Sequence, residues 1–98
     1  MTPELVAAVE AIIPTLGLDE DDVEAATRRG LLLAAAGGDL LAGIAPGSRA
    51  VLETASDLAD RGIGTDLMAA LGAAGIAAEP ADALESLAAI LLYYAVTA

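Results

Sequence analysis

The stretch LADRGIGTDLMAAL, residues 58–71, decides the fold of this chain. It predicts the end of one helix and the start of another within a few residues. Gly62 can adopt the left-handed conformation that ends a helix, and Ile63 can fold back onto that helix. Thr65 is a good N-cap, which predicts a second short helix over residues 66 to about 74, and Gly75 with Ile76 repeats the same Gly-Ile ending after it. The stretch therefore predicts two helices joined by a tight turn.

Similar start and stop signals occur along the rest of the chain. Thr2 is expected to cap a helix that begins at Pro3. Further helices are expected after Asp19 and Ser48, and Pro14 should end the first helix. The predicted helices span residues 3 to about 13, 20 to about 36, 48 to 61, 66 to about 74 and 80 nearly to the end. A short helical turn capped by Asp39 is also expected, with Leu40, Leu41 and Ile44 pointing inward. Whether the second helix breaks at Gly30 stays open.

The apolar residues recur with helical spacing throughout, and no window alternates like a strand. We therefore expect an all-α fold: a compact bundle of about five or six short helices, partly orthogonal in packing, with no sheet. Residues 1–98 form a single domain in this interpretation. The last helix has an apolar surface too wide for one neighbour, so it is either central or part of an interface.

The chain lacks seven residue types: Cys, His, Lys, Asn, Gln, Phe and Trp. Its hydrophobic fraction is 57% and its mean hydropathy is +0.69, mostly from Ala and Leu. The missing side chains supply the imidazole base, the thiolate, the ammonium group and the carboxamide. The core is therefore expected to be aliphatic, and most catalytic chemistry is excluded.

The net charge is −11, and the only cations are four arginines. Such a chain repels phosphate backbones and anionic membrane surfaces, so nucleic acid is an unfavourable partner. No signal peptide is recognisable, and the apolar run 86–98 is too short for a bilayer, which needs about 20 residues. Because the chain has no cysteine, its sequence does not indicate whether it belongs to an oxidising or a reducing compartment. A natural protein of this kind would be expected in the cytoplasm.

Residues 58–71, and no other part of the chain, carry a recognisable motif. The matching positions are Gly62, Ile63 and Gly64 in the turn, and Leu67, Met68 and Leu71 in the helix after it. The stretch resembles a helix-hairpin-helix motif, which implies a turn whose backbone N–H groups meet a nucleic-acid phosphate. That family usually places a cation after the turn, where this chain has Asp66. The mismatch of charge favours a purely structural hairpin.

The sequence offers few residues from which a catalytic, metal or cofactor site could be built. The acidic run 19–24 fails the EF-hand pattern, because its sixth position is Glu24 and its twelfth is Gly30. Its acids are better explained as a helix start whose dipole favours negative charge. No serine has an identifiable base, and the remaining acids are expected on solvated helix faces. We expect no enzyme, no metal and no cofactor.

The candidate interaction surface is the group Leu91, Leu92, Tyr93 and Tyr94 near the C-terminus. The adjacent tyrosines point about 100° apart on a helix, so they cannot both face one core. Both could also be amphipathic residues at a helix end. The possible partners are a second copy of the chain, as a homodimer, or another helical protein. No membrane contact is expected.

Three functional hypotheses follow. The favoured one is a designed or artificially constrained helical scaffold with no evolved catalytic activity. The reason is that the chain has few reactive side chains, while the residues that start and end its helices are almost all in place. The alternative is a small acidic interaction module, such as an adaptor, an antitoxin-like partner or a mimic of nucleic-acid charge. The third is nucleic-acid binding through the hairpin turn, which the charge opposes.

Overall fold

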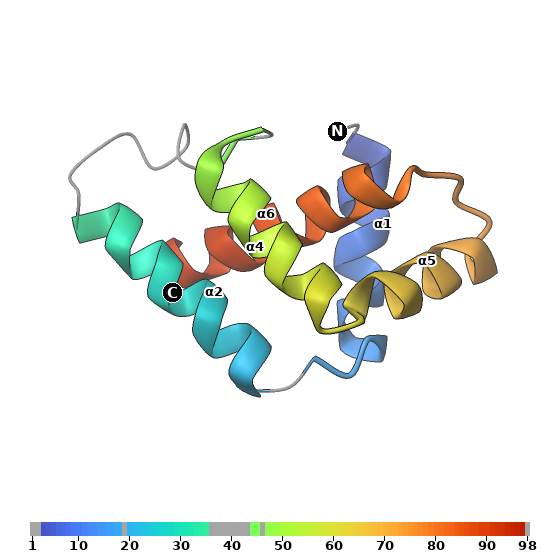
Figure 1. Cartoon of the computed structure of the whole chain (residues 1–98). Coiled ribbons are helices and arrows are strands. Elements are labelled where there is room, and N and C mark those ends of the chain that lie inside the picture. The colour runs from blue at the N-terminus through green and yellow to red at the C-terminus, as the bar shows by residue number, and fades with distance from the viewer. Residues whose placement is uncertain (1–2, 19, 36–43, 46, 98) are drawn as a thin grey trace.

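The structure is a computed structural model that describes residues 3–18, 20–35, 44–45 and 47–97. These residues contain no strand, and the predicted all-α bundle is confirmed (Figure 1). The elements are α1 (Pro3–Ile12), η1 (Ile13–Thr15, a 3-10 turn), α2 (Glu20–Ala35), α4 (Arg49–Asp60), α5 (Ile63–Ala73) and α6 (Pro80–Thr97). The radius of gyration of 12.5 Å is typical of a folded chain of this length, for which about 13 Å is expected. No helix in the described ranges is both long enough and apolar enough to span a bilayer.

The first helix ends where the sequence predicts. Pro14 lies in the 3-10 turn that follows α1, because a proline cannot continue the hydrogen-bond ladder. Helix α2 continues without a break through Gly30, which is buried. The expected caps Thr2 and Asp19, and the expected turn at residues 39–41, lie outside the described residues. Ile44, which was expected to point inward, is buried.

The corner between α4 and α5 confirms one expectation and corrects another. Ser48 caps α4, and its Oγ accepts a hydrogen bond from the Val51 N–H at 3.4 Å. Gly62 is left-handed, with a φ of 82°, as predicted. The expected helix start at Asp66 with Thr65 as cap is wrong, because α5 begins directly at Ile63. One left-handed residue already turns the chain, so Ile63 starts the helix and is buried.

The end of α5 is a complete Schellman motif. The Ile76 N–H donates to the Leu71 carbonyl at 2.9 Å, and the Gly75 N–H donates to the Gly72 carbonyl at 3.0 Å. Gly75 has a φ of 77°, which an L side chain adopts only with strain. The predicted Gly-Ile ending is therefore confirmed here in its hydrogen bonds as well as in its backbone angle.

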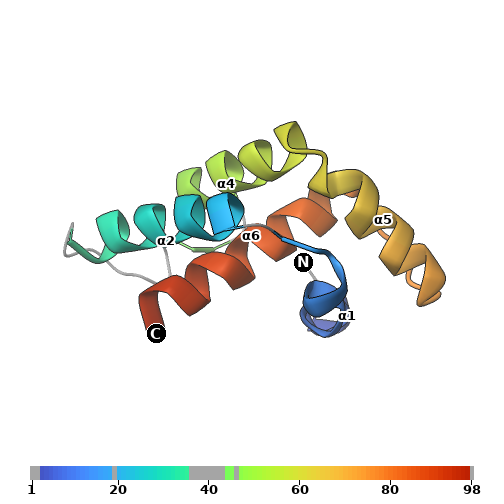
Figure 2. The ribbon, with the colours of Figure 1, turned by 90° about the horizontal axis from the view of Figure 1, so that it is seen from below.

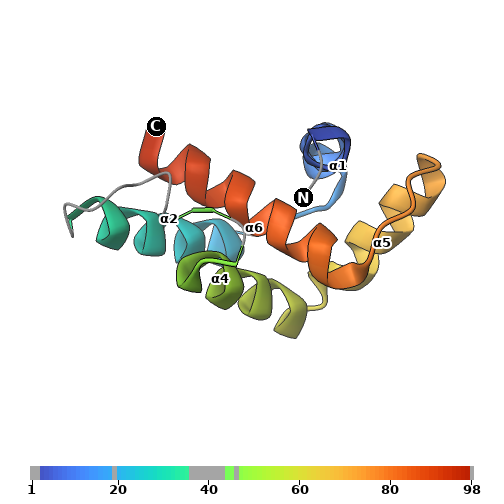
Figure 3. The same ribbon diagram turned by 90° about the horizontal axis from the view of Figure 1, so that it is seen from above.

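Helix α6 lies at the centre of the bundle and contacts α1, α2, α4 and α5. Figures 2 and 3 show α1 nearly end-on while α6 runs across the view, so these two helices cross. Helices α2 and α4 lie along the other side of α6. The wide apolar surface of α6 is thus explained by several neighbours. Its buried residues are Ala83, Ser86, Leu87, Ala88, Ile90, Leu91 and Leu92.

A polar clamp joins α2 to α4. Arg29 in α2 donates from Nη1 to Oγ1 of Thr54, and from Nη2 to Oδ2 of Asp57, both at 2.8 Å. Glu53 lies 3.6 Å from the Nε of Arg29 and also pairs with Arg49 at 2.8 Å. Thr54 is buried, so the guanidinium is the group that satisfies its hydroxyl oxygen. The clamp explains why an arginine is held between two helices in an aliphatic bundle.

Candidate functional site

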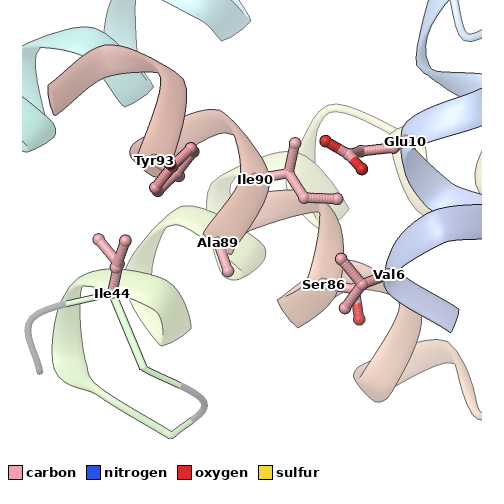
Figure 4. A pocket seen from close by; sticks show the side chains of 7 residues that line it. All are labelled: Val6, Glu10, Ile44, Ser86, Ala89, Ile90 and Tyr93. Atoms are coloured by element: carbon pink, nitrogen blue, oxygen red, sulfur yellow. The ribbon is translucent and has the colours of Figure 1, made fainter. Parts of the chain in front are cut away.

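A hollow of about 300 Å³ opens beside the crossing of α1 and α6 (Figure 4). We call it the α1–α6 hollow. It is lined by Val6 and Glu10 of α1, by Ser86, Ala89, Ile90 and Tyr93 of α6, and by Ile44. Its volume is at the small end of the range of about 300–1,000 Å³ that is usual for ligand sites. The hollow therefore has room for a side chain or a small ligand.

Helical spacing brings these residues to one place. Val6 and Glu10 are four residues apart on α1, so they lie on the same face of that helix. On α6, Ser86, Ala89 and Tyr93 recur at intervals of three and four and form one stripe. The Ser86 side chain is fully buried and donates to the Asp82 carbonyl at 2.9 Å, within its own helix. The lining is thus mainly aliphatic, with one carboxylate at its edge.

Glu10 is held in place by the neighbouring tyrosine. The Tyr94 hydroxyl donates to Oε1 of Glu10 at 2.8 Å and links the last helix to the first across 84 positions. Figure 4 shows the Glu10 carboxylate extending from α1 toward Ile90 of α6. The hydrogen bond to Glu10 raises the pKa of Tyr94 above its usual value, with smaller contributions from desolvation and nearby charge. The contact fixes one carboxylate oxygen and leaves the other available to accept further bonds.

The charges of the chain are segregated between its helices. All four arginines lie on α2, on α4 or in the turn after α4, where three of them pair with acids of the same two helices. Helices α1, α5 and α6 contain no basic residue. Their acids are Glu4 and Glu10 of α1, Asp66 of α5, and Asp82 and Glu85 of α6. The two helices that supply most of the lining of the hollow, α1 and α6, therefore carry acids and no bases, which favours cations over anions near them.

The structure divides the predicted interaction surface. Leu91 and Leu92 are buried in the core, so they are not available to a partner. Tyr93 and Tyr94 are each 48% exposed, and their ring centroids lie 6.2 Å apart. Two of the four residues are therefore not on the surface. The reason is that α6 lies at the centre and packs its apolar side chains against helices on several sides. The two tyrosines remain at the hollow or beside it.

Sequence reasoning did not find Val6, Glu10 or Ala89 as site residues. No local pattern marks them, because valine, glutamate and alanine are all common in any amphipathic helix. Only the crossing of α1 with α6 makes them neighbours. The one signal in the sequence was the pair of adjacent tyrosines, of which Tyr93 lines the hollow.

The hairpin turn at Gly62, Ile63 and Gly64 leads directly into α5. Ile63 is buried, and Gly64 lies inside the first turn of α5. A Cβ on Gly64 would lie 3.5 Å from a methyl group of Leu84 in α6. Asp66 is in the same first turn. The left-handed φ of 82° favours glycine at Gly62, whereas a Cβ on Gly64 would make only an ordinary van der Waals contact.

No metal site is apparent in the part of the chain that the structure describes, since no three of its acids gather closely enough to hold an ion. The side chains of residues 19–22 lie outside the described set. The chain matches no model of a known protein family, no curated protein and no solved structure. It therefore belongs to no recognisable specific family, and its function has to be argued from its own geometry and charge.

Proposed function

We propose that this protein is a small acidic interaction module that binds a basic helical segment of another protein across α1 and α6. The observation that carries the proposal is the position of the α1–α6 hollow, which opens on a face whose helices bear acids and no bases. A hollow of this size suits one side chain of a partner rather than a whole cofactor.

The exposed tyrosines support the same proposal. Tyr93 lines the hollow, and Tyr94 lies beside it through its hydrogen bond to Glu10. Tyrosine is enriched among the residues that dominate binding energies, because its rigid ring offers a large contact area with a polar tip. The two rings lie side by side, so both would contact the same face of a helix laid along α6, while one of its side chains enters the hollow.

The charge pattern favours a different protein over a second copy of this chain. A two-fold symmetric dimer through this face would bring two copies of the same base-free helices α1 and α6, with their acids, together. Like charges brought together in this way oppose association, and they do so most at low salt. A partner with lysine or arginine on its surface meets the same acids with attraction, which speeds association and selects among partners.

The test is a titration of the whole chain, labelled for NMR, with a lysine-rich amphipathic helical peptide. We expect saturable amide shifts centred on Val6, Ala89 and Ile90. Ala89→Leu fills the hollow and should weaken binding at least tenfold, which corresponds to about 1.4 kcal/mol. Ala69→Leu is the matched control, because Ala69 is an exposed alanine of α5 that does not line the hollow. Equal affinity in both variants, or no binding at low salt, would overturn the proposal.

A second candidate is a helical scaffold with no evolved catalytic activity. It is supported by the completeness of the local signals: a serine cap at Ser48, and left-handed glycines at Gly62 and Gly75. Under this proposal the peptide titration gives only weak, unsaturable shifts that spread over all acidic positions and vanish in salt.

A further inference from the structure

The chemistry of the hollow specifies more than a basic partner. Glu10 is its single charged lining residue, and its lining side chains are otherwise aliphatic apart from the Tyr93 ring and the Ser86 hydroxyl. The Ser86 hydroxyl already donates within α6, so it has no proton left to offer a ligand. A ligand that matches this lining has an apolar stem and a positively charged head.

The bond from Tyr94 determines what kind of head the carboxylate can take. Tyr94 occupies Oε1 of Glu10 at 2.8 Å. A guanidinium binds a carboxylate best through two parallel bonds, one to each oxygen. The tyrosine hydroxyl takes one of the two acceptor positions of Oε1, so a guanidinium that bonds both oxygens has to share that oxygen with it. An ammonium group is a compact charge that needs only one oxygen, so the arrangement favours lysine over arginine.

The walls of the hollow suit the stem of a lysine. Val6, Ala89 and Ile90 are aliphatic, and a lysine stem packs its methylene groups on such surfaces while its charge stays at the edge. The Tyr93 ring lines the same hollow and adds apolar surface for the stem at the end away from Glu10. Figure 4 shows Glu10 and Tyr93 extending from two different helices at opposite ends of this lining.

We propose that the α1–α6 hollow is a binding site for a primary aliphatic ammonium, which the partner supplies as a lysine side chain. The stem lies against Val6, Ala89 and Ile90, and the ammonium donates to the oxygen of Glu10 that Tyr94 leaves open. Tyr94 is a positioning residue, because it orients the carboxylate without touching the stem. This inference rests on the proposed function and adds the identity of the side chain that enters the hollow.

The first experiment uses small probes on the whole chain. In NMR titrations, n-pentylammonium should bind at millimolar concentration and shift the signals of Val6, Ala89 and Ile90. Pentanol and pentanoate, which share the stem but lack the cation, should bind at least fivefold more weakly. Glu10→Gln should remove the preference for the amine over the alcohol. Glu85→Gln is the control, because it removes a charge from α6 at a residue that does not line the hollow. A preference that survives Glu10→Gln, or is lost equally in Glu85→Gln, would overturn the inference.

The second experiment separates this inference from the proposed function. The lysine-rich peptide is compared with the same peptide carrying arginine in place of every lysine. We expect the lysine peptide to bind at least threefold more tightly, and Tyr94→Phe to remove that difference because it frees both oxygens of Glu10. If both peptides bind equally at the hollow, the lysine site is wrong and the interaction module stands. If pentylammonium binds and neither peptide does, the ammonium site stands and the interaction module is wrong.

Discussion

Arg29 in α2 binds Asp57 in α4 at 2.8 Å, across 28 positions of sequence. The same guanidinium satisfies Thr54, whose exposed fraction is only 3%. Arg28, one residue earlier, forms a single pair with Glu24 on the surface of its own helix. Two adjacent arginines thus have different structural roles, because only one of them faces α4.

The Arg29 clamp should contribute measurably to stability. We expect Arg29→Ala to lower the free energy of unfolding by about 1–2 kcal/mol, because it removes charged hydrogen bonds and leaves a buried hydroxyl without its donor. The control Arg28→Ala should cost no more than about 0.5 kcal/mol, as is typical of an exposed pair within one helix. Urea unfolding followed by circular dichroism measures both. Equal losses in the two variants would contradict the clamp.

The two glycines at the end of α5 should respond oppositely to alanine. Gly75→Ala forces a side chain into a left-handed backbone, so we expect a loss of about 1 kcal/mol. Gly72 lies in the helix, and a Cβ added there would meet only open space, so Gly72→Ala should stabilise the protein by about 0.5 kcal/mol. Thermal melts of both variants give the signs directly. A gain at Gly75 would show that the Schellman ending is not under conformational constraint.

The bond between Tyr94 and Glu10 should be visible in an alkaline titration. Tyr93→Phe leaves Tyr94 as the single tyrosine, so the tyrosinate absorbance reports its pKa alone. We expect a midpoint above the usual value of about 10, and a fall toward it when Glu10→Gln is added. The same midpoint with and without Glu10 would contradict the contact.

The sign of the accompanying stability change follows from the raised pKa. The folded state holds the Tyr94 proton more tightly than the unfolded chain does, so the contribution is present below the unfolded pKa of about 10. It is lost as the pH rises through the folded pKa. The difference in unfolding midpoint between the wild-type chain and Tyr94→Phe should therefore shrink at alkaline pH, as measured by urea titrations at a series of pH values. A difference that grows with pH would refute this linkage.

Core leucines should be far more costly to truncate than the leucine on the outer face of α4. Leu67 is completely buried, so Leu67→Ala should cost about 2–5 kcal/mol. Leu52 is 49% exposed, and Leu52→Ala should cost less than about 1 kcal/mol. Urea unfolding of both variants tests the assignment of α5 to the core. A small effect at Leu67 would mean that α5 is not packed as described.

Much of the fold was predictable from local signals. Pro14, Ser48 and Gly75 each end or start a helix where the sequence indicates. The error at α5 was also local: Thr65 is a good cap by residue type, and the sequence alone does not tell how few residues the turn needs. Little of the candidate site was predictable: of the four residues of the predicted surface, Tyr93 and Tyr94 are exposed, whereas Leu91 and Leu92 lie in the core.

The sequence by itself determined the all-α class, most helix boundaries and the excess of negative charge, because these depend on residues within one or two helical turns and on simple counting. Only the tertiary structure decided which side chains meet. Arg61 lies four residues after Asp57 in the sequence, and a local pattern would suggest this arginine as its partner. The fold brings Arg29 of α2 to within 2.8 Å of the same carboxylate. Tyr94 reaches Glu10 across 84 positions because α6 lies at the centre and α1 crosses it. The arrangement of the helices depends on the total apolar area that residues from the whole chain bury together, and no short stretch of sequence determines that total.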